Sequence, residues 1–221
     1  MSDEDLLPKN FTKERNLWTI FIQARRIPAN KFNVLSTALF FGASIATVWL
    51  SSRSSADTTQ IVRDGAVLGF NTSLVVLGFL VAGFTIFATI SNPNMLIRMG
   101  GTRHPDSGLS WLKHTFFLLI RVFIYYISFL VFCFIIIFFG SQGGLLSTLL
   151  RFTPNSDYVK FCIVNIAFVI LVSWQYFLLV QLKSFIFNIY HSVVASLRWK
   201  AEGYDEKQEP SENVNKRDGA T

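Results

Sequence analysis

Four long segments that are almost free of charge constrain this chain more than any other feature. They cover residues 34–52, 66–90, 115–139 and 161–182, and their one charged side chain is Arg121. About 20 apolar residues suffice for a helix to cross a bilayer. Charged residues make up 15% of the whole chain, whereas soluble domains usually carry about 25%. Buried helices of a soluble protein would also need polar faces. The sequence therefore predicts an all-α integral membrane protein with four transmembrane helices.

The positions of lysine and arginine predict the orientation of these spans. Residues 1–31 carry six of them, the segment after residue 182 carries six, and the loop after the first span carries two. Lysine and arginine near span ends favour the cytoplasmic side. We therefore expect a multi-pass protein of the plasma (inner) membrane with both termini in the cytoplasm. Its parts are a cytoplasmic N-terminal segment (1–31), a four-span membrane domain (32–200) and a polar, disordered cytoplasmic tail (201–221).

The N-terminal segment contains a predicted amphipathic helix from Thr12 to Arg26. Thr12 is a plausible cap, and Pro28 ends the element. A basic, tryptophan-bearing helix next to a span is typical of one that lies in the headgroup layer. The alternative is that it packs on a cytoplasmic domain of the same protein.

Two further helical segments flank the spans. After the second span, Asn92 is expected to cap a short helix that begins at Pro93 and stops at Gly100–Gly101. The pattern of the fourth span continues through residues 183–200, which predicts a long helix that extends into the cytoplasm. Such a helix is about 60 Å long. The alternative is a bend that lays the extension flat on the membrane.

Small residues interrupt two of the spans at helical spacing. Helices in lipid associate through close backbone contact at small residues. We therefore expect helix packing there, against another span or against a second copy of the chain; a pore lining is the alternative. The first small-residue stripe is Ala38, Gly42 and Ala46, and the second is Gly78, Ala82, Thr85 and Thr89.

Polar side chains inside spans are costly, so they are candidate functional residues. Arg121 and Gln175 are expected at one depth on the cytoplasmic side, unless Arg121 reaches up to the headgroups. Asn71 and Asn165 have matching depths near the outer face, which would allow a bond across spans two and four. A polar stripe at the end of span four is a candidate partner-docking surface or pore lining, and it consists of Gln181, Ser184, Asn188 and His191.

The sequence carries no catalytic signature. The spans contain no carboxylate and no histidine, and no phosphate loop, dinucleotide fingerprint or metal-ligand spacing occurs. Cys133 and Cys162 are expected to be buried apolar fillers. We therefore expect a chain that is not an enzyme and needs no metal or cofactor, and no nucleic acid as a direct partner.

Two functions fit this pattern. The first is a non-enzymatic membrane subunit that forms homo-oligomers and anchors or senses for a cytoplasmic protein partner, a role that suits a bacterial stress or defence complex. The second is an oligomeric channel or pore-forming membrane protein.

Overall fold

The computed structural model describes residues 14, 16–51, 53–141, 144, 145, 148, 152 and 156–203. Over these residues the chain is helical, and no β-strand is formed. The tail beyond residue 203 and residues 12, 13 and 15 of the predicted N-terminal helix lie outside this part of the chain. The helices in chain order are α1 (Leu17–Ala24), α2 (Lys31–Leu50), α3 (Ser55–Ile90), α4 (Pro93–Gly101), α5 (Trp111–Phe139) and α7 (Ser156–Ala201).

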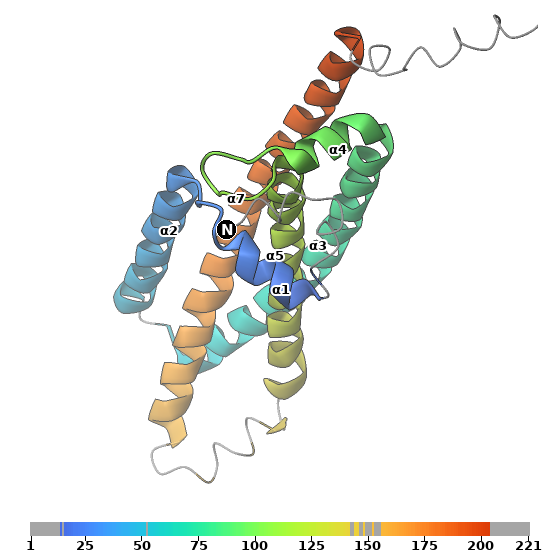
Figure 1. The fold of residues 1–221 in the computed structure, drawn as a ribbon. Coiled ribbons are helices and arrows are strands. Elements are labelled where there is room, and N and C mark those ends of the chain that lie inside the picture. Colours follow the sequence, from blue (N-terminus) through green and yellow to red (C-terminus); the bar gives the residue numbers. More distant parts are fainter. Residues whose placement is uncertain are drawn as a thin grey trace, which may run out of the picture.

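Four of these helices, α2, α3, α5 and α7, are long and apolar enough to cross a membrane, with mean hydropathies between 1.5 and 2.8 over their most apolar windows. They contain the predicted spans, except that α2 ends at Leu50 whereas the first span was expected to reach residue 52. The expected four-span, all-helical architecture is thus confirmed at the level of helix length and composition. Helix α7, which contains the fourth span, is unbroken for 46 residues, or about 69 Å at 1.5 Å per residue. Its last turns run past α4 (Figure 1).

The helix ends follow from capping residues in the sequence. Side-chain oxygens of Asn16, Asn30, Ser54, Asn92 and Ser110 accept hydrogen bonds from backbone N–H groups in the first turn of α1 to α5. These N–H groups have no partner within the helix, so a cap stabilises the start. The predicted short helix is present as α4, with Asn92 as its cap and Pro93 in its first turn.

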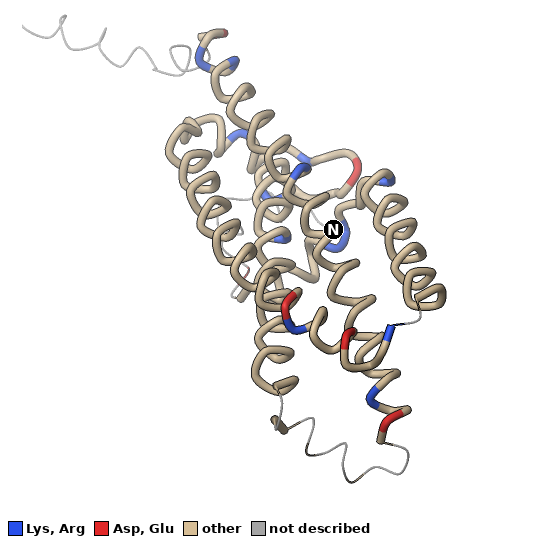
Figure 2. The backbone as a smooth tube through the Cα atoms, turned by 180° about the vertical axis from the view of Figure 1, so that it is seen from behind, with Lys and Arg blue, Asp and Glu red and all other residues tan. Residues whose placement is uncertain are grey.

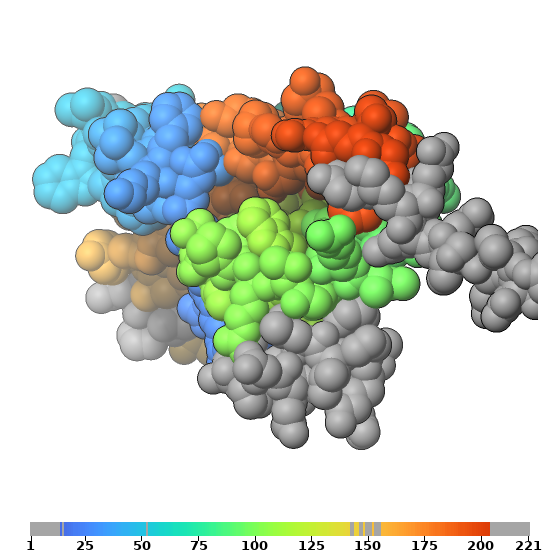
Figure 3. Space-filling model, turned by 45° about the horizontal axis from the view of Figure 1, so that its top comes forward, coloured from blue at the N-terminus to red at the C-terminus, as the bar shows by residue number. Residues whose placement is uncertain are grey.

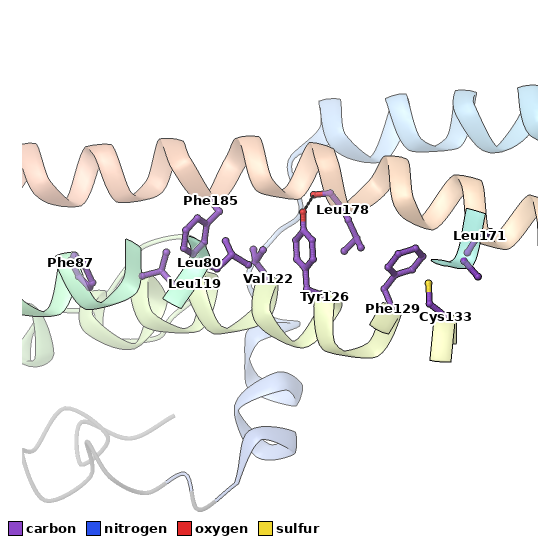
Figure 4. Packing of buried hydrophobic residues seen from close by; sticks show 11 residues of the cluster. Leu80, Phe87, Leu119, Val122, Tyr126, Phe129, Cys133, Leu171, Leu178 and Phe185 are labelled. Carbon is purple, nitrogen blue, oxygen red and sulfur yellow. Dashed lines mark hydrogen bonds between the residues drawn. The ribbon is translucent and has the colours of Figure 1, made fainter. Parts of the chain in front are cut away.

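The core lies among α3, α5 and α7. Aromatic rings fill much of it: Phe123 contacts Phe185 at 6.2 Å between ring centroids, and Phe129 contacts Trp174 at 5.7 Å. Figure 4 shows this row of buried side chains along α5, from Leu119 to Cys133. Cys133 is buried as predicted, whereas Cys162 is only half-buried.

The other two helices lie outside this core. Helix α2 contributes no side chain to it and packs on α7, at one side of the bundle (Figures 1 and 3). Helix α1 packs on α5 through Ala24, Ile27 and Phe117, while Leu17 and Trp18 stay exposed. Helix α1 spans eight residues, which makes it shorter than the predicted helix. Its place in the headgroup layer stays a prediction.

Charge is distributed unequally between the two ends of the bundle (Figure 2). We call the end that carries α4 and the C-terminal part of α7 the α4 end. Among the described residues, nine lysines and arginines lie there with three acids; the opposite end has three of each. The nine are Arg25, Arg26, Lys31, Arg98, Arg103, Lys113, Lys183, Arg198 and Lys200, and the three acids are Glu14, Asp106 and Glu202.

Candidate functional site

The contact between α2 and α7 contains two pairs of polar side chains that face each other across the helices. Asn33, which is 3% exposed, donates from Nδ2 to Ser184 Oγ at 2.8 Å. Two turns further on, the rings of Phe40 and Tyr176 stack at 4.3 Å between centroids. Nearer the other end of α2, the buried hydroxyls of Ser44 and Ser173 are 3.5 Å apart. Polar groups therefore face each other at two levels of the interface, with a stacked aromatic pair between them.

Two buried polar atoms in this interface have no hydrogen-bond partner within the described chain. They are Asn33 Oδ1 and Thr37 Oγ1. Because Asn33 and Thr37 are four residues apart, they share one face of α2. In lipid, an unsatisfied polar group costs several kcal/mol. We call the surface formed by Asn33, Thr37, Ser44, Ser173 and Ser184 the α2–α7 polar interface. It is a candidate for a site that takes up water or a ligand hydroxyl.

The predicted polar stripe of span four is divided by this contact. Gln181 is buried, at 8% exposure, and Ser184 is engaged by Asn33. Asn188 is half-buried, and His191 is exposed, with its ring 4.5 Å from that of Phe187. Only the last part of the stripe is thus available on the surface of a single chain.

Arg121 is bound by the backbone of α1. Its Nη1 donates to Ala24 O at 3.3 Å and to Ile27 O at 3.1 Å. These carbonyls lie at and just after the end of α1, where few backbone donors remain; Ala24 O also accepts from Ile27 N at 3.2 Å. Gln175, predicted at the same depth, is half-buried on α7 and is not among the hydrogen-bond partners of Arg121. Arg121 therefore fastens α1 to α5.

The bond between Asn71 and Asn165 is not formed. Asn71 is exposed on α3, and Asn165 donates from Nδ2 to Phe161 O of its own helix at 2.9 Å. Matching depth brings two residues to one level, but contact also requires facing sides of the helices. The prediction was wrong because it considered depth alone.

The two small-residue stripes lie on the outer surface of the chain. All seven residues are exposed, and a Cβ added to Gly42 or Gly78 would meet no atom within 4 Å. The stripes therefore make no close contact between spans in a single chain. Packing against a second copy stays a prediction.

Other glycines bring α3 close to its neighbours, and sequence reasoning missed them. A Cβ on Gly69 would lie 3.0 Å from Phe129 Cε1, and one on Gly65 would lie 3.0 Å from Leu171 Cδ2. On Gly83 it would lie 2.9 Å from Ile189 Cδ1. The signal was present, because Gly65 and Gly69 form a GxxxG pattern, which favours close helix packing in membranes.

A pair of histidines near α4 was missed as well. The rings of His104 and His114 stack at 3.7 Å between centroids with an interplanar angle of 2°. His104 is 8% exposed and also contacts Trp111. Ser107 Oγ lies 2.9 Å from His114 Nδ1. The turn between α4 and α5 is thus held by packed rings as well as by its backbone bonds.

These arrangements bind helices to one another, and none of them resembles a catalytic centre. Within the part of the chain that the structure describes, no group of three or more histidines, cysteines or acids is close enough to hold a metal ion. Comparisons with known protein families, curated proteins and solved structures find no match.

Proposed function

We propose that this chain is a non-enzymatic, multi-pass subunit of the plasma (inner) membrane that self-associates and anchors or senses for a cytoplasmic protein partner. The observation that carries the proposal is the exposure of both small-residue stripes, with open space at Gly42 and Gly78. Lipid alone gives no reason for glycine and alanine at these positions. Helices in membranes associate where small residues let their backbones approach.

The positions of the stripes favour an assembly that continues from copy to copy. The first stripe lies on α2, and the second lies in the C-terminal half of α3, on the other side of the bundle (Figures 1 and 2). A contact between the first stripe of one copy and the second stripe of the next is a head-to-tail contact. Such contacts generate rings or filaments.

The α4 end supports the partner half of the proposal. The extension of α7 exposes Ile186, Val194 and Leu197 there, and α1 exposes Trp18. Exposed apolar residues next to excess positive charge suit a protein partner with an acidic rim. Both chain termini belong to this end in our proposal, because an even number of spans returns the chain to its starting side.

An oligomeric pore is the alternative, and it has weaker support. Its lining was expected along the polar stripe. Gln181 is buried within the single chain, and Ser184 is bonded to Asn33 in the chain's own α2–α7 contact. A pore therefore depends on Asn188, His191 and the second small-residue stripe.

Native mass spectrometry of the full chain, released from detergent, tests self-association. We expect oligomers from the wild type and a shift toward monomer in Gly78→Leu and Gly42→Leu. Phe79→Leu is the matched control, because Phe79 is 57% exposed on α3 but lies about 100° around the helix from Gly78. A monomeric wild type, or oligomers that persist in both glycine variants, contradicts self-association. For the partner, affinity capture under mild detergent that recovers this chain alone contradicts the anchoring role.

A conductance measurement separates the alternative from the proposal. The wild type in planar bilayers is expected to be silent if the chain is an anchoring subunit. Reproducible conductance that is abolished by Gln181→Leu with Asn188→Leu supports the pore instead.

A further inference from the structure

We propose that the junction of α2 and α7 at the α4 end binds the headgroup of an anionic membrane lipid. Two contacts fix this junction. Lys183 Nζ lies 4.4 Å from the centroid of the Phe32 ring, and Asn33 Nδ2 donates to Ser184 Oγ at 2.8 Å. The first turn of α2, which begins at Lys31, is therefore held beside Lys183. We call Lys31 and Lys183 the basic pair.

The positive charge of the basic pair is not neutralised by the described part of the chain. Neither lysine forms an ion pair with a described residue, and both side chains are exposed. Of the three acids at the α4 end, Glu14 pairs with Lys113 and Glu202 pairs with Arg198, which leaves Asp106. Arg25 adds another exposed cation six residues before Lys31. The start of α2 adds the positive end of a helix dipole.

The contact with Phe32 restrains Lys183. A cation over an aromatic face is attracted by the electrons of the ring. The long side chain is thereby held near the start of α2 without a carboxylate. An anion that approaches the start of α2 thus meets the charge of Lys183, whose position is partly fixed, and the exposed Lys31, which precedes Phe32 in the same turn.

The surface next to the basic pair suits the acyl chains of the same molecule. Residues four apart lie one above the other on a helix. On the membrane side of Lys31, Leu35 is 63% exposed and Leu39 is 67% exposed. On the membrane side of Lys183, Leu179 is 56% exposed. Cations at one level with exposed leucines directly below them match an amphiphile with an anionic head, whereas a soluble phosphate would use only the cations.

The position along the chain agrees with a headgroup level. Lys31 begins an apolar helix, and Lys183 directly follows the apolar segment 161–182. Clusters of lysine and arginine at such positions attract anionic lipids by about 1 kcal/mol per residue. The proposal requires that α2 and α7 cross a membrane, but it does not depend on self-association or on a protein partner.

The test compares lipid retention by the full chain in native mass spectrometry, with phosphatidylglycerol and phosphatidylcholine of identical acyl chains as probes. We expect the wild type to retain phosphatidylglycerol in preference to phosphatidylcholine. The double variant Lys31→Gln/Lys183→Gln removes two surface cations, which corresponds to about a 10- to 30-fold loss of that preference. The matched control is Arg53→Gln/Lys160→Gln, which removes two cations from the opposite end and is expected to keep the preference.

Three results overturn the proposal. The first is an unchanged preference in the double variant. The second is an equal loss in the control, because this would indicate a general effect of net charge. The third is displacement of phosphatidylglycerol by millimolar inorganic phosphate, because the ligand would then be a soluble anion. Circular dichroism of both variants checks that the helices are intact, and the exposure of all four side chains makes their loss compatible with folding.

Discussion

Arg121 of α5 donates a hydrogen bond from Nη1 to the backbone carbonyl of Ile27 at 3.1 Å. The same nitrogen lies 3.3 Å from Ala24 O. A guanidinium inside an apolar helix thus occupies the carbonyl end of α1, where the helix dipole is negative. This contact offsets part of the cost of a charge in a membrane-spanning helix, and it positions α1 along α5.

Replacement of Arg121 by methionine is expected to release α1. Hydrogen bonds from charged groups contribute about 1.5–3 kcal/mol, so amide exchange over residues 17–27 should become roughly 10- to 100-fold faster. Hydrogen–deuterium exchange of the purified chain measures this. Arg63→Met is the control, because Arg63 makes the equivalent bond to Gly140 O, from Nε at 2.8 Å, near the opposite end. Unchanged exchange in Arg121→Met, or an equal change in the control, contradicts this role of Arg121.

The overall architecture could be predicted because membrane-spanning helices have a strong sequence signal. The four long helices were predicted from segments that are almost free of charge. Helix α4 was predicted from an asparagine and a proline at its start and a glycine pair at its end. These features depend on composition and local chemistry. They need no knowledge of which sides of the helices face one another.

The contacts between helices were predicted less well, for the same reason. Asn71 and Asn165 share a depth but not a facing side. Gly78 was expected in a packing contact because of its neighbours in the stripe, whereas Gly69, on another side of α3, makes the contact with α5. The partners of Arg121 are backbone carbonyls, which every residue possesses, so no pattern of side chains could identify them.

The buried ion pair between Glu14 and Lys113 is expected to be sensitive to the loss of one partner. The Oε1–Nζ distance is 2.7 Å, and the side chains are 6% and 12% exposed. Breaking a buried pair costs about 3–5 kcal/mol, because a buried charge remains without compensation. Glu14→Leu should therefore lower the unfolding temperature of the full chain in detergent more than Glu14→Leu/Lys113→Met does.

The exposed pair of Arg198 and Glu202 provides the comparison for that experiment. Its side chains are 77% and 39% exposed, and exposed pairs contribute about 0–1 kcal/mol. Glu202→Leu should shift the unfolding temperature little. If Glu14→Leu has an equally small effect, the pair between Glu14, which precedes α1, and Lys113 of α5 does not contribute to stability.

The hydroxyl of Tyr126 links α5 to α7 in the middle of the core. It donates to Leu178 O at 3.1 Å, as Figure 4 shows. Tyr126→Phe removes this bond and keeps the ring, so we expect a loss of about 1 kcal/mol in the free energy of unfolding. Tyr125→Phe is the matched control, since the ring of Tyr125 packs on Phe177 while its hydroxyl makes no hydrogen bond within the described chain. Equal losses in both variants would show that the bond across the helices is not the cause.

The close approach of α3 to α5 makes Gly69 poorly tolerant of a side chain. In Gly69→Ala the new Cβ would lie 3.0 Å and 3.1 Å from two atoms of the Phe129 ring and 3.4 Å from Cys133 Sγ. A rigid ring inside the core cannot rotate away, and overpacking typically costs about 1–3 kcal/mol.

Gly83→Ala should cost less, because its nearest contact, at 2.9 Å, is the terminal methyl of Ile189, which can change rotamer. Gly78→Ala is the control, with open space around the new carbon. The unfolding temperatures of the three variants, measured in detergent, should therefore be lowest for Gly69→Ala, intermediate for Gly83→Ala and highest for Gly78→Ala. Any order in which Gly69→Ala equals the control contradicts the packing of α3 on α5.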